Sequence, residues 1–336
     1  MNRVNLKFLL LYLIFNFAFI HCIYSQDENL SEKEIFEKGV EYYNLGKYNQ
    51  AVAYFSKFLT NNPKSSTAYF NRALSYYSLK DYSNSLKDYN KVIELKPNDV
   101  DALSNRGLIY EDIGEFNKAV NDYNRALELD PNNTDALSGR GICFQYLSEF
   151  ENGIKDHSRI IELNPLNAPA YNNRGNCYYE LKKYDISFLD YTRAIEIDPN
   201  YAEPYYNRGG VYVVLGSYQK AMMDFDKAIE LNPNYQKAFT SRGKIYFKYK
   251  EYANALNDFN KAIDLKPDGE NYFNRGIAYE YLEIYEKAID DYVKSIELSP
   301  DNAYLYQCRG KVYVKLGKEK EAEIDFKKAK ELGWKE

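Results

Sequence analysis

The stretch PYYNRGGVYVVLGSYQKAMMDFDKAIELNP, residues 204–233, decides the fold because a near copy, AYNNRGNCYYELKKYDISFLDYTRAIEIDP, occupies residues 170–199. In each copy small or aromatic residues recur every three or four positions, stop at a short polar segment, and resume until a proline. This spacing is typical of two amphipathic helices joined by a turn. Because proline cannot continue the second helix, each copy predicts one helical hairpin.

Prolines set the length of the repeat. They are spaced by 34 residues six times and then by 33, at Pro63, Pro97, Pro131, Pro165, Pro199, Pro233, Pro267 and Pro300. Counting back from them gives nine units, which start at residues 32, 66, 100, 134, 168, 202, 236, 269 and 303. A period of this length indicates a repeat array in which each hairpin buries its apolar face against its neighbours. We therefore expect an all-α solenoid over residues 32–336 and no second domain.

Further repeated positions carry a family resemblance. The eighth residue of every unit is Gly or Ala, the eleventh is aromatic and the twentieth is small, as in Gly209, Tyr212 and Ala221. With the 34-residue period, this pattern resembles the tetratricopeptide repeat. The resemblance implies an α-solenoid of about nine hairpins that forms a right-handed superhelix. It also implies a concave groove, lined by the first helices, that receives a peptide or a segment of a partner protein.

Arginine and aspartate appear together in units two to nine. The seventh position there is Arg, where the family most often has Leu, and the twenty-third is Asp; the first unit has Lys38 and Tyr54 instead. Because guanidinium and carboxylate can bond bidentately, we predict an ion pair between the two helices of each unit. The pairs include Arg72 with Asp88, Arg106 with Asp122, Arg174 with Asp190, and Arg208 with Asp224. The alternative is an arginine ladder for an anionic ligand.

The first 25 residues have the order of a secretory signal peptide. Arg3 and Lys7 precede the apolar run of residues 8–20, which is too short to span a bilayer, and a polar segment follows. We expect cleavage after Ser25, a short linker at residues 26–31, and an exported protein, periplasmic or secreted. Two alternatives attach the protein to a membrane: an uncleaved N-terminal anchor, or lipidation of Cys22.

Composition excludes several classes of function. A chain of 336 residues with 45% hydrophobic and 28% charged residues is able to fold. Its net charge of −5 and pI near 5.4 argue against binding nucleic acid. Outside the predicted signal peptide the chain has three cysteines, Cys143, Cys177 and Cys308. Their odd number does not indicate a disulfide framework, and their spacing does not indicate a zinc site.

Residues suited to catalysis are scarce. Beyond His21 in the signal segment, the one histidine is His157, which occupies a position where the other units have Phe or Tyr. A substituted core residue is therefore favoured over a catalytic or metal-binding one. No phosphate-binding loop, nucleophile elbow or metal-ligand spacing is present. We expect no enzyme activity, no cofactor and no bound metal.

Two functional hypotheses of different class remain. The first is a non-enzymatic scaffold that binds a peptide or a partner segment in the concave groove. The second is a structural subunit of an envelope or secretion assembly, in which the outer faces and ends make permanent contacts. A monomeric mature protein that takes up peptides favours the first, and stable co-purification in a large complex favours the second. Neither hypothesis requires nucleic acid or a small-molecule cofactor, and a membrane enters only if the signal is retained or Cys22 is lipidated.

The resemblance places ligand contacts at the second, fifth, ninth, twelfth and thirteenth positions of the units. At the start of the array these positions are apolar: Phe36, Val40, Tyr43, Phe70, Leu74 and Tyr77. They are acidic in the middle, at Asp101, Glu111, Asp112 and Asp135, and basic later, at residues that include Lys237 and Lys244. For the apolar group, the alternative is that packing covers the side chains.

Asparagine recurs at the sixth position. Asn71, Asn105, Asn173, Asn207 and Asn274 resemble the asparagine ladder with which some family members hold a peptide backbone, and a structural role is the alternative. Asn176, Asn207 and Lys237 match part of the clamp that holds chaperone tails, but Asn172 and Ser241 replace two of its cations. A heat-shock chaperone is therefore disfavoured as a partner. Lys330 stands where earlier units have Leu or Ile, so we expect it to be exposed at the end of the array.

Overall fold

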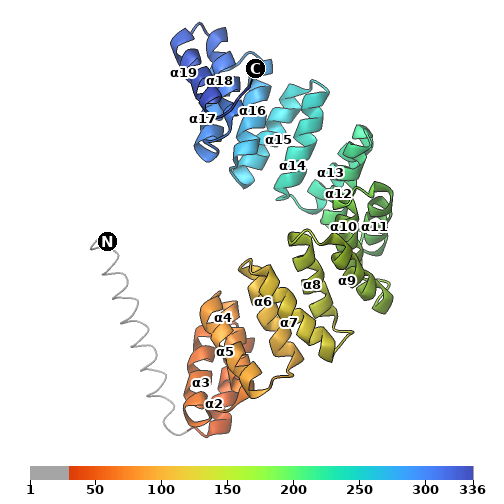
Figure 1. Cartoon of the computed structure of the whole chain (residues 1–336), viewed down its shortest axis with the longest axis vertical. Helices are drawn as coiled ribbons and strands as arrows, with labels where there is room; N and C mark the ends of the chain where they lie inside the picture. The colour runs from red at the N-terminus through yellow and green to blue at the C-terminus, as the bar shows by residue number, and fades with distance from the viewer. Residues whose placement is uncertain (1–29, 336) are drawn as a thin grey trace, which may run out of the picture. The chain divides into compact units, whose positions relative to one another are not determined.

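The computed structural model describes residues 30–335; the predicted signal peptide, residues 1–25, lies outside this range, as do residues 26–29 of the predicted linker. Within the range the chain forms eighteen α-helices and no strand (Figure 1). The predicted all-α fold of paired helices is confirmed. The helices are α2 (Glu32–Asn44), α3 (Tyr48–Asn61), α4 (Ser66–Ser78), α5 (Tyr82–Leu95), α6 (Val100–Asp112), α7 (Phe116–Leu129), α8 (Thr134–Tyr146), α9 (Phe150–Leu163), α10 (Ala168–Glu180), α11 (Tyr184–Ile197), α12 (Ala202–Val214), α13 (Tyr218–Leu231), α14 (Gln236–Lys248), α15 (Tyr252–Leu265), α16 (Gly269–Tyr281), α17 (Tyr285–Leu298), α18 (Ala303–Lys315) and α19 (Glu319–Glu331).

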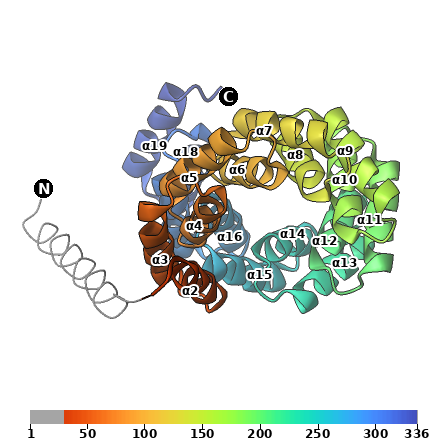
Figure 2. The ribbon, with the colours of Figure 1, turned by 90° about the horizontal axis from the view of Figure 1, so that it is seen from below.

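The chain divides into two compact units. Unit 1 ends at Pro165 and contains α2 to α9, and unit 2 begins at Leu166 and contains α10 to α19. In unit 1, Figure 2 shows the first helices α6 and α8 along one side of the row and the second helices α7 and α9 along the other. In unit 2, α12 and α14 are separated from α13 and α15 in the same way (Figure 2). We call the side of each unit that its first helices form the first-helix face.

The turn inside each hairpin has a left-handed residue at its centre. In the first hairpin Gly46 has φ +68°; its N–H donates to the carbonyl of Tyr43, and that of Lys47 donates to the carbonyl of Tyr42. These bonds form a Schellman motif, which satisfies carbonyls at the end of α2. The equivalent residue has positive φ in all nine hairpins: Gly46, Lys80, Gly114, Ser148, Lys182, Gly216, Lys250, Glu283 and Gly317.

A small residue on the first helix lets an aromatic ring of the second helix approach closely. A Cβ atom on Gly107 would lie 2.9 Å from the ring of Tyr123, which is itself only 2% exposed. The same contact joins Gly209 to Phe225, at 2.6 Å. Since real side chains do not pack this closely, glycine at the eighth position allows the two helices of these hairpins to touch; the second hairpin has the small residue Ala73 at this position.

His157 takes the place of this ring in the fourth hairpin. Its side chain is fully buried against Gly141, and its Nε2 lies 3.0 Å from Nε2 of Gln145. The structure thus places His157 in the core, as the repeat pattern predicts. At the end of the array Lys330 is exposed, which also agrees with the prediction.

Other properties of residues 30–335 bear on function. No helix in this part of the chain is both long enough and apolar enough to cross a bilayer. Within the same residues, no three His, Cys, Asp or Glu side chains are grouped so that they could hold a metal ion. Cys143, Cys177 and Cys308 are buried free thiols.

Candidate functional site

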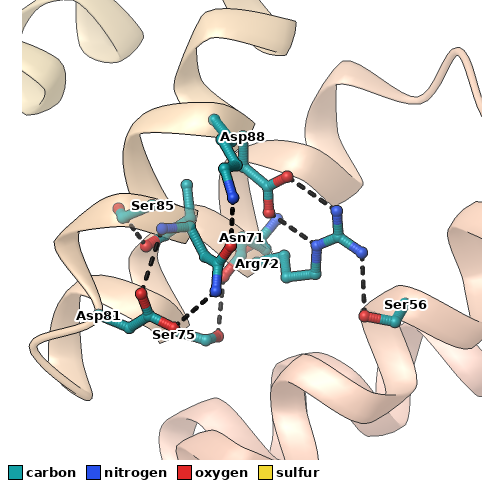
Figure 3. Close-up of polar contacts among 10 residues, drawn as sticks. Ser56, Asn71, Arg72, Ser75, Asp81, Ser85 and Asp88 are labelled. Carbon is teal, nitrogen blue, oxygen red and sulfur yellow. Dashed lines mark hydrogen bonds and ion pairs between the residues drawn. The ribbon is translucent and has the colours of Figure 1, made fainter.

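Bidentate ion pairs join the two helices of the hairpins. Arg72 Nε lies 2.7 Å from Asp88 Oδ2, and Arg72 Nη2 lies 2.8 Å from Asp88 Oδ1 (Figure 3). The pattern recurs in eight hairpins, in each of which the arginine side chain is 17–22% exposed and the aspartate 3–9%. The structure therefore contains the pairs that the sequence predicted. They are Arg72–Asp88, Arg106–Asp122, Arg140–Asp156, Arg174–Asp190, Arg208–Asp224, Arg242–Asp258, Arg275–Asp291 and Arg309–Asp325.

These arginines also bind the preceding hairpin. The sequence did not predict this contact. Nη1 of Arg72 donates to Ser56 Oγ at 2.9 Å, as Figure 3 shows, and the polar acceptor lies in the preceding second helix. Equivalent acceptors are Asn90, Asn124, Thr192, Asp226 and Asn260. The sequence feature that could have predicted this contact is a polar residue at the twenty-fifth position of most units. With Nε, Nη1 and Nη2 engaged in these hairpins, the arrangement disfavours the arginine ladder for an anionic ligand.

Polar contacts between successive first helices mark the first-helix face. In unit 1, Tyr77 on α4 donates to Asp112 on α6 at 2.8 Å. In unit 2, Lys315 on α18 donates to Glu280 on α16 at 2.9 Å, and Lys244 on α14 pairs with Glu270 on α16. These residues stand at the second, ninth, twelfth and thirteenth positions, so the predicted ligand positions do lie where first helices meet.

The six apolar candidates of unit 1 are all half-buried: Phe36, Val40, Tyr43, Phe70, Leu74 and Tyr77. Phe36 packs edge-on against Phe55 and Phe58, with ring centroids 5.6 and 5.2 Å apart. Phe70 packs against Tyr89 at 5.5 Å. These two rings therefore belong partly to the core, while each candidate keeps some surface exposed.

Tyr89 lies on α5 and is only 1% exposed. Its hydroxyl has no hydrogen-bond partner among the described residues. Burial, followed by the proximity of Tyr43, Tyr77 and Asp101, raises the pKa of Tyr89. The phenol therefore remains neutral, and its O–H is a buried donor close to residues of the first-helix face.

Acidic side chains continue this face of unit 1. Asp101 and Asp112 are exposed, whereas Glu111 is half-buried and accepts a hydrogen bond from Tyr123 at 3.1 Å. Burial raises the pKa of Glu111 despite that bond, and the charge of Asp112 raises it further. Tyr123 also explains a gap in the asparagine row: a Cβ on Gly139 would lie 2.4 Å from its hydroxyl.

The sixth-position asparagines have different environments. Asn71 and Asn105 each donate to a carbonyl four residues back in their own helix, at Thr67 and Asp101, which favours a structural role for both. Asn274 is half-buried, and its Nδ2 has no partner among the described residues.

Unit 2 contains the most connected asparagines. Asn207 Nδ2 donates to Asn172 Oδ1 at 2.9 Å and to Asn176 Oδ1 at 3.0 Å, which links α12 to α10. Asn176 also accepts from Tyr191, and Asn172 Nδ2 lies 3.4 Å from the side-chain oxygen of Asn173. The structure thus brings four asparagines of α10 and α12 into one cluster. Further along this unit, Lys244 is engaged by Glu270, and Lys237 is exposed.

Family models match the chain along most of its length. The tetratricopeptide repeat models cover residues 100–133, 168–201, 202–235 and 237–268, and also 35–65 and 303–332. A further TPR repeat model covers residues 73–114 and 281–317. The chain belongs to the tetratricopeptide repeat family. The fourth hairpin, α8 and α9, has the repeat fold although it lies outside these matches.

Several solved structures, among them tetratricopeptide repeat proteins, share the fold. One from Parabacteroides merdae is 23% identical, with a TM-score of 0.62, and the match covers 75% of this chain and 97% of that one. PilF of Pseudomonas aeruginosa is 22% identical, with a TM-score of 0.54 and coverage of 60% and 92%. A chain of the APC/C hetero-tetramer Cut9–Hcn1 is 17% identical, with a TM-score of 0.58 and coverage of 90% and 73%. No curated protein matches the sequence significantly.

Membership of this family sets the general class of function. Tetratricopeptide repeat proteins are generally protein-interaction scaffolds, and their all-helical repeats are typically non-enzymatic. In this chain, ion pairs such as that of Arg72 with Asp88 hold the two helices of a hairpin together.

Proposed function

We propose that this protein is an exported scaffold that binds an extended peptide segment of a partner protein on its first-helix face. The observation that carries the proposal is the row of half-buried apolar side chains contributed by α2 and α4, the first helices of two successive hairpins. Exposed apolar surface on a folded protein commonly marks a contact site. Tyr43, Leu74 and Tyr77 belong to this row and stand at ligand positions of the family.

In unit 2, polar groups of the first-helix face would suit recognition of a peptide backbone. Asn176 has an amide nitrogen for which no hydrogen bond is present within the described residues, and Asn207 uses its own amide nitrogen to hold Asn176 in place. An amide both donates and accepts, so such side chains can pair with peptide groups of any sequence.

Export is the second part of the proposal. The order of charges and apolar residues within residues 1–25 supports a cleaved signal, so the mature chain should begin at Gln26. N-terminal sequencing of the exported protein tests this step. If residues 8–20 were retained, a membrane-anchored scaffold would replace an exported one.

Display of random dodecapeptides tests binding directly. The bait is the chain from Gln26, which keeps every described residue, and selected peptides are resynthesised with a photo-crosslinking residue. Crosslinks should map to α4 and α6. If no peptide were selected, or if crosslinks fell on α5 and α7, the scaffold would not use this face.

A pair of matched leucine variants adds a quantitative check. Leu74→Ser removes part of the apolar row, whereas Leu189→Ser changes a leucine that is 64% exposed on the second helix α11. We expect the Leu74 variant to bind the selected peptide at least about tenfold more weakly, and the Leu189 variant to bind it as tightly as the unchanged protein. Equal effects of the two substitutions would contradict the assignment of the site.

A further inference from the structure

The charges on the first-helix face are balanced differently in the two units. In unit 2, Lys244 and Lys315 are paired with Glu270 and Glu280. In unit 1, the acidic residues at the same kinds of position have no cationic partner among the described residues: Asp101, Glu111, Asp112 and Asp135. Two of them accept hydrogen bonds from tyrosines, which leaves their negative charge uncompensated.

We propose that the first-helix face of unit 1 selects a peptide segment in which Lys or Arg stands beside an apolar or aromatic residue. The proposal rests on the peptide-binding function proposed above. The basic side chain pairs with Glu111 and Asp112 at the end of α6, and the apolar neighbour packs on the half-buried Leu74 and Phe70 of α4. Asp101 lies near the other end of α6, about 16 Å away along the helix, so it pairs with a second basic side chain of the segment.

The surroundings strengthen this choice of partner. Tyr77, which is half-buried and donates to Asp112, presents ring surface beside the acidic residues. A cation gains energy over an aromatic face as well as beside a carboxylate. An acidic or neutral peptide would leave the carboxylates unpaired. Because Asp101 and Asp112 are exposed, their contribution should decrease as salt is added.

The composition of selected peptides tests the proposal. The same dodecapeptide selection is run on the unchanged chain and on the triple variant Asp101→Asn, Glu111→Gln and Asp112→Asn. Peptides from the unchanged chain should be enriched in Lys or Arg next to apolar residues, and the triple variant should lose the basic enrichment while retaining the apolar one. Apolar enrichment without basic residues would overturn this inference alone, whereas failure to select any peptide would overturn the proposed function.

A matched control separates a specific site from general attraction to a negative protein. The variant Asp264→Asn, Glu286→Gln and Asp290→Asn removes the same number of charges from exposed positions on α15 and α17. By fluorescence anisotropy, a selected basic peptide should bind the first triple variant at least about tenfold more weakly and the control within twofold of the unchanged chain. Similar weakening in both variants would show that net charge alone attracts the peptide.

Discussion

Arg106 and Asp122 form two parallel hydrogen bonds, of 2.7 and 2.6 Å, that join α6 to α7 in unit 1. Nη1 of Arg106 reaches back to Asn90 on α5 at 2.6 Å. One side chain thus connects three helices from two hairpins. Since neighbouring hairpins stabilise one another in repeat proteins, this link should matter for the stability of the whole unit.

We expect Asp122→Asn to lower the free energy of unfolding by about 2–3 kcal/mol, because it leaves the largely buried guanidinium of Arg106 without its carboxylate. Asn90→Ala removes only the third bond and should cost about 1 kcal/mol. Urea denaturation followed by circular dichroism measures both changes. Equal losses in the two variants would mean that the link between hairpins is as important as the ion pair.

Two substitutions at the left-handed turn position should change stability in opposite directions. Lys182 has φ +59° and Gly216 has φ +71°, and both occupy the fifteenth position of their units. A side chain is unfavourable in this conformation, so Lys182→Gly should raise the free energy of unfolding by up to about 1 kcal/mol, and Gly216→Ala should lower it by about 1 kcal/mol. A Cβ on Gly216 would meet nothing within 4 Å, which excludes a steric clash as the cause. Thermal midpoints that moved in the same direction would contradict the backbone explanation.

Glu111 should make stability depend on pH. Its surroundings are the hydroxyl of Tyr123, the carboxylate of Asp112 and the thiol of Cys143, and burial raises its pKa above the ordinary glutamate value of 4.5. The folded state therefore holds the proton more tightly than the unfolded state, so the contribution of Glu111 to stability falls as pH rises through this window. We expect Glu111→Gln to gain stability relative to the unchanged protein between pH 4 and pH 7. Denaturation at the two pH values measures the difference, and a relative loss at pH 7 would contradict the assigned environment.

The cysteines should be unreactive in the folded protein. Burial raises the pKa of Cys143 and of Cys177 to about 12, and that of Cys308 to about 11, so little thiolate is present at pH 8. A chain that starts at Gln26 carries only these three cysteines. Ellman's reagent should react with them slowly under native conditions and with all three in denaturant. Rapid native reaction of one thiol would show that its hairpin opens locally.

Some features of this protein followed from the sequence alone because they recur at fixed positions. The prolines predicted where second helices end, the small residues at the eighth position predicted close helix contacts, and Arg with Asp in the same units predicted the ion pairs. His157 could be assigned to the core because eight other units place an aromatic residue there. A pattern that recurs in every unit does not depend on any single residue. It therefore predicts the contacts that are made within each hairpin.

Contacts between neighbouring hairpins required the tertiary structure. Asn71 and Asn207 occupy the same repeat position, yet Asn71 binds a carbonyl of its own helix and Asn207 binds two side chains of the preceding first helix. The repeat pattern likewise does not reveal that Lys244 meets Glu270, or that the hydroxyl of Tyr89 lacks a partner while that of Tyr123 has one. These outcomes depend on which residues two successive units happen to place opposite one another. The periodicity determines the backbone, and the non-repeated residues that meet across the packed hairpins determine the chemistry of the first-helix face.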